Sequence, residues 1–298
     1  WIYTVKRFNL KGQVDSISDP YFSNGSPLWN RHQYDNYGRT SSLNRPSGRN
    51  SSWVYSSNVV TETTAGKSFT KTYSSDGTVS SASDAGGTIS YTYFPDGKVK
   101  AITAPGSIVT QIQYDIAGNQ TQLVDPSAGT INYTYNGFGE LLTQQNARLQ
   151  TTTITYNANG TISRKVTPEG TTKYRYNSNK QLVNVNSYGT VSHTYGYDSK
   201  GRVTSVIDTI PGTTPLTTSF TFDTYGRSST ITHPTGLVET NNYNSYGYLY
   251  RIDAGGNAVW TTSSMNARNQ TTAGQYGNNL SAGYGFDNYG SPTSITAG

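Results

Sequence analysis

The stretch that decides the fold is Tyr197-Asp198-Ser199-Lys200-Gly201-Arg202-Val203. It combines an aromatic residue, an Asp that can bond backbone amides two residues further on, and a Gly that accepts a positive φ at the end of a turn. Most of the remaining chain is either a copy of this stretch or a spacer between copies. We therefore predict a chain built from repeats of one turn-centred unit.

The copies recur with a nearly constant period. From Tyr73 onward the anchor residues are spaced 20, 21, 21, 21, 20, 21, 25, 21, 22 and 21 residues. The gap of 39 residues between Tyr34 and Tyr73 predicts one degenerate unit near Tyr55. The motif positions to which we assign a structural role are Tyr34, Asp35, Gly38, Tyr114, Asp115, Gly118, Tyr135, Gly139, Tyr156, Gly160, Tyr197, Asp198, Gly201, Phe222, Asp223, Gly226, Tyr243, Gly247, Phe286, Asp287 and Gly290.

Each unit contains a second turn about half a period after the first. Asp84-Ala85-Gly86-Gly87 and Asp125-Pro126-Ser127-Ala128-Gly129 are examples, and the residues between turns alternate and are β-branched or aromatic, as in 130–135 and 151–156. This pattern is typical of β-strands. One unit is therefore predicted to be one β-hairpin, and about a dozen units predict roughly two dozen short strands.

The predicted fold class is all-β, with one long antiparallel sheet of hairpin repeats. A sheet of this size twists and cannot stay flat. Propeller blades need a longer period, so we expect the hairpins to spiral into a hollow and incomplete wall. Residues 1–33 are an irregular lead-in, continuous with the repeat array of residues 34–298. Residues 18–27 predict an insertion loop, and the longer spacing at 208–215 predicts an exposed loop.

The composition restricts the function. The net charge of +5 arises from 22 basic and 17 acidic residues, and the basic residues are scattered, which argues against nucleic-acid binding. The absence of cysteine leaves the cellular compartment open. No apolar stretch is long enough for a transmembrane helix. The chain begins at Trp1 and ends within a repeat, so we expect it to be a piece of a longer polypeptide.

The motif resembles the YD repeats of the Rhs family, which includes the B and C components of bacterial Tc toxins, polymorphic Rhs toxins and the teneurins. The resemblance rests on Tyr-Asp-x-x-Gly-Arg at 34–39 and 197–202 and on Phe-Asp-x-x-Gly-Arg at 222–227. It implies a spiralling sheet that builds a hollow shell, which in toxin members encloses a C-terminal toxin. The Arg- and Pro-rich core that ends such shells in Asp-Pro-x-Gly is absent, and Asp125-Pro126 does not fit it. Neither autoproteolysis nor toxin activity is therefore assigned to any residue.

We assign no catalytic, cofactor-binding or metal-binding residue. The motif carboxylates could be calcium ligands, but each turn supplies one, so turn capping is the preferred interpretation. His32, His193 and His233 lack the spacing of metal ligands, and nothing places Glu140 near Glu169. The alternating tyrosines resemble a sugar-binding surface, yet cross-strand tyrosine ladders explain them better.

The sequence thus predicts a non-enzymatic shell segment of a secreted or cell-surface bacterial protein. Its expected partner is the remainder of its own polypeptide, either a C-terminal toxin or a shell-closing region, with secretion machinery as a further candidate. The alternative is an adhesin or carbohydrate-binding module that binds cell-surface glycans through exposed tyrosines and the loop at 208–215.

Overall fold

The computed structural model describes residues 1–287 and 289–298. Every regular element in these residues is a β-strand, and every strand pair for which a register is defined is antiparallel, as in the hairpin of β15 and β16. The predicted all-β antiparallel fold is confirmed. Asn288, which belongs to the last motif copy, lies outside the described residues. No helix long and apolar enough to cross a membrane occurs in the described part of the chain.

The strands are short and more numerous than the two dozen expected. In the first half of the chain they are β1 (Ile2–Tyr3), β2 (Lys6–Phe8), β3 (Val14–Ser18), β4 (Tyr21–Phe22), β5 (Trp29–Tyr34), β6 (Thr40–Asn44), β7 (Ser51–Ser56), β8 (Val59–Thr64), β9 (Lys67–Tyr73), β10 (Val79–Asp84), β11 (Gly87–Tyr93), β12 (Val99–Ala104), β13 (Ile108–Tyr114), β14 (Gln120–Asp125) and β15 (Gly129–Tyr135). In the second half they are β16 (Leu141–Gln145), β17 (Thr151–Tyr156), β18 (Ile162–Thr167), β19 (Gly170–Tyr176), β20 (Leu182–Ser187), β21 (Val191–Tyr197), β22 (Val203–Thr209), β23 (Leu216–Phe222), β24 (Ser228–Thr232), β25 (Val238–Tyr243), β26 (Leu249–Ala254), β27 (Asn257–Met265), β28 (Thr271–Tyr276), β29 (Ser281–Phe286) and β30 (Pro292–Ala297).

The chain divides into two compact units. Unit 1 comprises Trp1–Ile112, Ser264–Ala273 and Gly283–Ala297. Unit 2 comprises Gln113–Ser263, Gly274–Ala282 and Gly298. Each unit is described separately below.

In unit 1, consecutive strands pair as a meander. Strand β2 pairs with β3, β3 pairs with β5, and each later strand pairs with the next as far as β13. The stretch expected to be a loop at 18–27 also contains strand β4, which pairs with β1 in a small separate sheet. Tyr21 and Phe22 form that strand directly after Pro20, so the stretch contains a short strand and is not a continuous loop.

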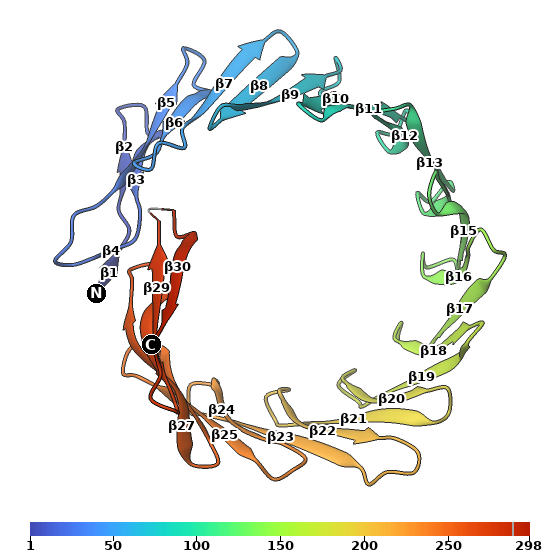
Figure 1. The fold of residues 1–298 in the computed structure, drawn as a ribbon. Helices are drawn as coiled ribbons and strands as arrows, with labels where there is room; N and C mark the ends of the chain where they lie inside the picture. The colour runs from blue at the N-terminus through green and yellow to red at the C-terminus, as the bar shows by residue number, and fades with distance from the viewer. Residues whose placement is uncertain (288) are drawn as a thin grey trace. The chain divides into compact units, whose positions relative to one another are not determined.

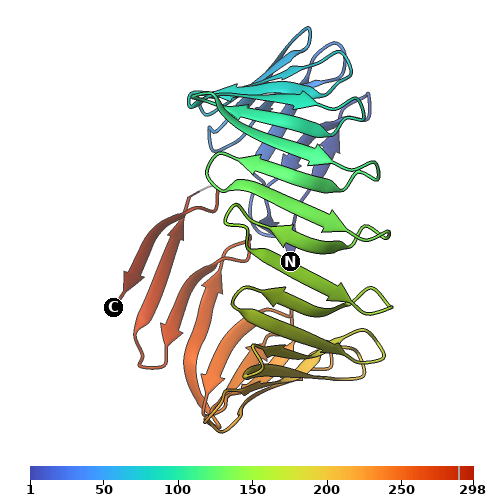
Figure 2. The same ribbon diagram turned by 90° about the vertical axis from the view of Figure 1, so that its right-hand side faces the viewer.

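In unit 2, strands β14 to β27 form an uninterrupted series in which each strand pairs with the next. Figure 2 shows these hairpins lying side by side, with turns alternating between the two edges of the sheet. The strands follow a curved path in Figure 1, which gives unit 2 a concave and a convex side. Strand curvature of this kind follows from the twist that each strand pair adds.

A β-bulge accompanies the motif turns. In the hairpin of β15 and β16, Thr134 pairs with Thr143 and Tyr135 with Leu141, so one residue of β16 has no partner. The same shift occurs at Tyr156, at Tyr197 and at further anchors. A bulge bends the strand and increases its local twist. The motif therefore sets both the turn and the curvature.

The chain has almost no hydrophobic core. Ala282 is the buried hydrophobic residue found in the described part of the chain. The total accessible surface is 18736 Å², whereas a compact protein of this mass exposes about 12,400 Å². Single layers of sheet that are covered on neither face account for the difference. Contacts between neighbouring hairpins must therefore hold the fold together.

Candidate functional site: the motif turns and the concave wall

The Asp of the motif closes its own turn. Asp198 accepts hydrogen bonds through Oδ1 from the backbone amides of Lys200, at 2.9 Å, and Arg202, at 3.0 Å. The amide of Gly201 donates to the Asp198 carbonyl at 3.0 Å, and Gly201 has a φ of 81°. This geometry combines an Asx turn with a left-handed residue that favours glycine. The carboxylate is thus occupied by its own turn.

The other predicted motif residues occupy equivalent places. The aromatic anchors end strands β5, β13, β15, β17, β21, β23, β25 and β29, and the predicted glycines all have a positive φ. Other motif side chains also cap their turns by accepting hydrogen bonds from backbone amides, and these include Asp35, Asp115, Asp223 and Asp287. No group of three or more His, Cys, Asp or Glu side chains that could hold a metal ion occurs among the described residues.

The residue four positions after the Asp or Asn has a complementary side chain, and sequence analysis did not find this relationship. The Oδ2 atoms of Asp35, Asp198 and Asp223 accept from Arg Nε at 2.7, 2.7 and 2.6 Å. In six turns that carry Asn in place of Asp, the Asn Nδ2 donates to a side-chain acceptor four positions later. These pairs are Asn9–Gln13, Asn136–Glu140, Asn146–Gln150, Asn157–Thr161, Asn177–Gln181 and Asn266–Gln270. In the sequence, these turns can be identified by an Asp or Asn that is followed four positions later by a residue of complementary charge or hydrogen-bonding type.

Two further turns were expected only as turns, and the structure shows that both are copies of the motif turn. Asn9 to Gln13 form one, and Asn146 to Gln150 form another at the opposite edge of the sheet, where Leu149 takes the glycine position with a φ of 61°. The stretch from Asn146 to Gln150 has the composition of a short helix. The spacing of four positions between its Asn and Gln is the feature that identifies it as a motif turn. Tyr55, expected to anchor a degenerate unit, lies one residue before the end of β7, and the hairpin of β7 and β8 has a two-residue turn at Ser57 and Asn58.

The anchor tyrosines join each hairpin to the preceding one. The hydroxyl of Tyr197 donates to the Leu182 carbonyl at 2.6 Å, and that of Tyr156 donates to the Leu141 carbonyl at 3.0 Å. Each acceptor lies two residues after the glycine position of the preceding motif. The same bond is formed by Tyr34, Tyr55, Tyr93, Tyr135 and Tyr243. This contact differs from the expected cross-strand tyrosine ladders, because the hydroxyl group makes it to a backbone carbonyl.

The motif Arg joins its turn to the next anchor. The guanidinium of Arg202 lies 4.1 Å from the ring centroid of Phe222, and that of Arg227 lies 4.1 Å from the ring of Tyr243. Arg39 lies at the same distance from Tyr55. Because each Arg also binds its own Asp, it stabilises two hairpins at once. The motif is therefore a connector between repeats as well as a turn.

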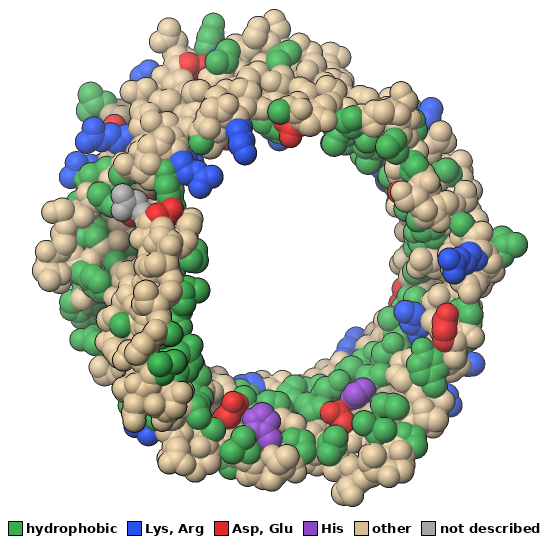
Figure 3. All heavy atoms as spheres, in the orientation of Figure 1, with side chains coloured by type: hydrophobic (Ala, Val, Ile, Leu, Met, Phe, Trp, Pro, Cys, Tyr) green, Lys and Arg blue, Asp and Glu red, His purple; other side chains and the backbone are tan. Residues whose placement is uncertain are grey.

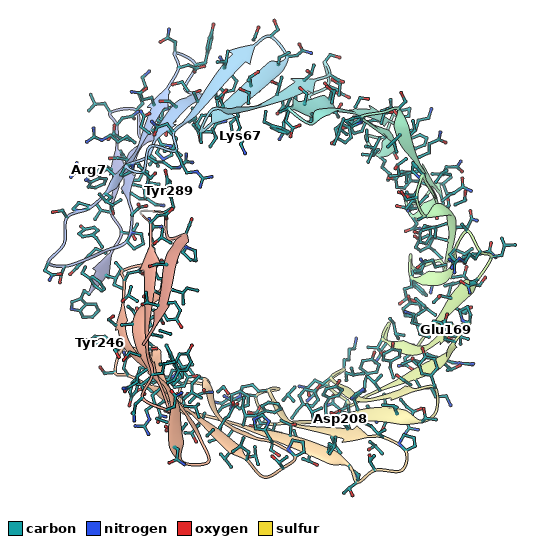
Figure 4. All side chains as sticks on the ribbon, viewed as in Figure 1. Arg7, Lys67, Glu169, Asp208, Tyr246 and Tyr289 are labelled. Carbon is teal, nitrogen blue, oxygen red and sulfur yellow. The ribbon has the colours of Figure 1, made fainter. Side chains whose placement is uncertain are left out.

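The remaining candidates are dispersed. His193 Nδ1 lies 2.6 Å from Asp208 Oδ1 on the neighbouring strand, and His233 Nε2 lies 3.4 Å from Glu239 Oε2. Asp208 lies within β22, so the exposed loop expected at 208–215 begins at Ile210. Figure 4 shows Asp208 on this part of the wall.

Glu140 and Glu169 belong to turns at opposite edges of the sheet, so they do not form an acidic pair. Glu140 follows β15 and accepts from Asn136. Glu169 lies in the turn between β18 and β19, where a hydrogen bond from Thr167 lowers its pKa.

The concave side of unit 2 is the second candidate site. Burial alternates along strand β17. Thr152, Ile154 and Tyr156 are half-buried, whereas the residues between them are exposed. Hydrophobic side chains gather on the concave side over β21 to β24 (Figure 3). Burial also raises the pKa of the Tyr135, Tyr156 and Tyr176 hydroxyls. The concave side of unit 2 thus presents both hydroxyl groups and apolar side chains.

Comparisons with known proteins agree with this geometry. The family described as the teneurin YD-shell matches residues 105–298. Among solved structures, TcdB2-TccC3 gives a TM-score of 0.85 at 17% identity, over 98% of this chain and 18% of that chain. The Photorhabdus luminescens Tc holotoxin pore gives 0.83 at 16% identity, over the same shares. These two likenesses concern the fold, and this chain spans 18% of the length of each. No curated protein matches the chain.

Proposed function

The chain belongs to the teneurin YD-shell family, and we propose that it forms a wall segment of a protein shell that encloses another part of its own polypeptide. The observation that carries this proposal is the curved single-layer sheet of unit 2, whose concave side carries apolar side chains. An enclosing wall needs a large two-sided surface and no thick core. The accessible surface of 18736 Å² fits that requirement.

The chemistry of the wall supports a passive role. The motif carboxylates, amides and guanidiniums bind one another within and between turns, as Asp198 and Arg202 do. The half-buried rows on the strands present apolar and hydroxyl groups, which suit contact with a polypeptide. The proposed role is therefore structural, and we assign no enzymatic activity to the chain.

The partner in this proposal is the remainder of the polypeptide, either a C-terminal toxin or a shell-closing region. The matched Tc toxin chains are much longer than this one, which supports a larger assembly. A secreted or cell-surface bacterial location follows from the same proposal, with secretion machinery as a further partner.

Protease protection of the natural full-length polypeptide tests the proposal. We expect the residues outside this chain to resist a brief protease pulse in the native protein and to be cleaved when the hydroxyls of Tyr135, Tyr156 and Tyr197 are removed together by substitution with Phe. Ile116→Ser, at an exposed turn tip, is the matched control. Equal cleavage of the outside residues in the native protein and the triple variant would contradict the proposal.

A second candidate function is glycan binding at a cell surface. An open groove of about 820 Å³ lies between the turns that follow β15 and β17, lined by residues that include Phe138, Ile154, Asn157 and Asn159. An exposed aromatic ring beside amide groups suits a sugar ring. Retention on a glycan array that Phe138→Ala abolishes, together with an unprotected remainder of the polypeptide, would favour this function over the shell.

A further inference from the structure

The residue just before the motif glycine is aromatic in several turns, and its exposure differs between them. Tyr37, Phe138, Tyr225 and Tyr246 are 85%, 91%, 83% and 75% exposed. Tyr289, at the equivalent position of the last motif copy, is half-buried. Aromatic rings that are this exposed bury little surface and contribute little to the fold. Single exposed rings are common on protein surfaces, so the contacts of an equivalent ring are needed to assign them a role.

Tyr289 shows what such a ring binds. Within unit 1 its hydroxyl donates to the carbonyl oxygen of Ser47, and the guanidinium of Arg49 lies 5.1 Å from its ring centroid. Ser47 and Arg49 belong to the turn between β6 and β7, which is closed by a bond from the Gly48 amide to the Arg45 carbonyl at 3.0 Å. Figure 4 shows Tyr289 beside these N-terminal strands. The ligand of the turn-tip tyrosine is thus an Arg-bearing β-turn.

Two of these exposed tyrosines lie on neighbouring hairpins of unit 2. Tyr225 precedes the glycine of the turn between β23 and β24, and Tyr246 precedes that of the turn between β25 and β26. Successive turns on one edge are two strand spacings apart, about 9–10 Å. Arg227 lies 4.9 Å from the Tyr225 ring, and its charge is balanced by Asp223 at 2.6 Å. The two rings therefore form a two-point patch that carries little net charge.

We propose that Tyr225 and Tyr246 form a docking site for a β-turn of a partner protein that presents an Arg and a free backbone carbonyl. The phenol hydroxyl supplies the donor for the carbonyl, and the ring face supplies the site for the guanidinium. The Asx turn holds the backbone of each tip, because the amides of Tyr225 and Tyr246 donate to the side chains of Asp223 and Asn244. The contact of Tyr289 with the turn of Arg49 is the precedent within the same chain. This site adds an outer partner and does not depend on the proposed shell function.

The chain itself provides the probe. A peptide of residues 42–52, cross-linked through its ends, reproduces the turn that Tyr289 binds, since Ser42 pairs with Ser52 across β6 and β7. We expect saturable binding of this fluorescent peptide to the 298-residue protein, with an affinity that falls at least about 10-fold in the Tyr225→Ser, Tyr246→Ser double variant. Arg49→Gln in the peptide should weaken binding to a similar degree. The Ile116→Ser control should bind as the unmodified protein does.

Three results would overturn the site. One is that the double variant binds the peptide as tightly as the unmodified protein does. Another is a loss of binding in Tyr289→Ser alone, which would mean that the peptide merely displaces the internal turn. The last is equal binding by the Arg49→Gln peptide, which would make the contact non-specific. Self-association of the unmodified chain in sedimentation, lost in the double variant, would support the site and identify a second copy as the partner.

Discussion

The hydroxyl of Tyr197 donates to the carbonyl oxygen of Leu182, at 2.6 Å and 15 residues earlier in the chain. Leu182 is the first residue of β20, and Tyr197 is the last residue of β21. The bond therefore ties the end of one hairpin to the residue just after the preceding motif turn. In a sheet with almost no core, repeated bonds of this kind supply the order that side-chain packing supplies in other proteins.

Replacing Tyr197 with Phe tests the contribution of this bond. The ring remains and only the hydroxyl is lost, so we expect a decrease of about 0.5–1.5 kcal/mol in the free energy of unfolding. Urea unfolding followed by circular dichroism measures it. Tyr195→Phe, on the same strand, is the control and should change less. Equal effects of the two substitutions would show that the bond from Tyr197 has no special role.

The pairing of Asp198 with Arg202 predicts a specific double-variant result. Asp198→Asn keeps the acceptor for the backbone amides but turns an NH₂ group toward the Arg, so we expect the melting temperature Tm to fall by about 1–3 °C. Adding Arg202→Gln recreates the combination found at Asn177 and Gln181 and should restore part of the loss.

The unrestored part of that loss has its own source. Arg202 also lies over the Phe222 ring, at 4.1 Å, and Gln cannot replace this contact. Calorimetric Tm values for the single and double variants, compared as a cycle, separate the two contributions. A double variant less stable than both singles would show that side-chain complementarity does not govern the turn.

The glycine position of the motif allows a stabilising substitution. Lys180 replaces Gly there and has a φ of 61°, a conformation that costs a non-glycine residue roughly 1 kcal/mol. Lys180→Gly should therefore raise the free energy of unfolding by up to about 1 kcal/mol, less the small contribution of the bond from Lys180 Nζ to the Asn159 carbonyl. Gly201→Ala is the opposite change and should destabilise the protein, because an added Cβ would lie 3.0 Å from Gln181 Nε2.

Much of the fold was predictable because turn chemistry and strand periodicity are local. The hairpin, the period and the capping role of Asp198 follow from residues that are close in sequence. The bond from Tyr197 to Leu182 was not predictable, since both residues fit a strand equally well without it. The pairing of β4 with β1 was also missed, because the two prolines in residues 18–27 indicated a loop more strongly than the two aromatic residues indicated a strand. The role proposed for the exposed ring of Tyr246 was also not predictable, because it depends on the contacts of Tyr289 in three dimensions.

The motif carboxylates predict how stability depends on pH. The backbone amide of Arg202 lowers the pKa of Asp198, and the Asn119 side chain and amide lower that of Asp115. A carboxylate whose pKa is lower in the folded state stabilises the fold above its unfolded pKa and loses this effect as the pH falls through the folded value. With an ordinary Asp value of 3.8, we expect Tm to change little down to about pH 5 and to fall below about pH 4.

Thermal unfolding at successive pH values measures this decline, and Asp115→Asn provides the control. The amide side chain does not titrate, so this variant should lose less stability between about pH 4 and pH 2 than the unmodified protein does. An equally steep acid decline in Asp115→Asn and the unmodified protein would show that the Asp115 turn does not contribute to it.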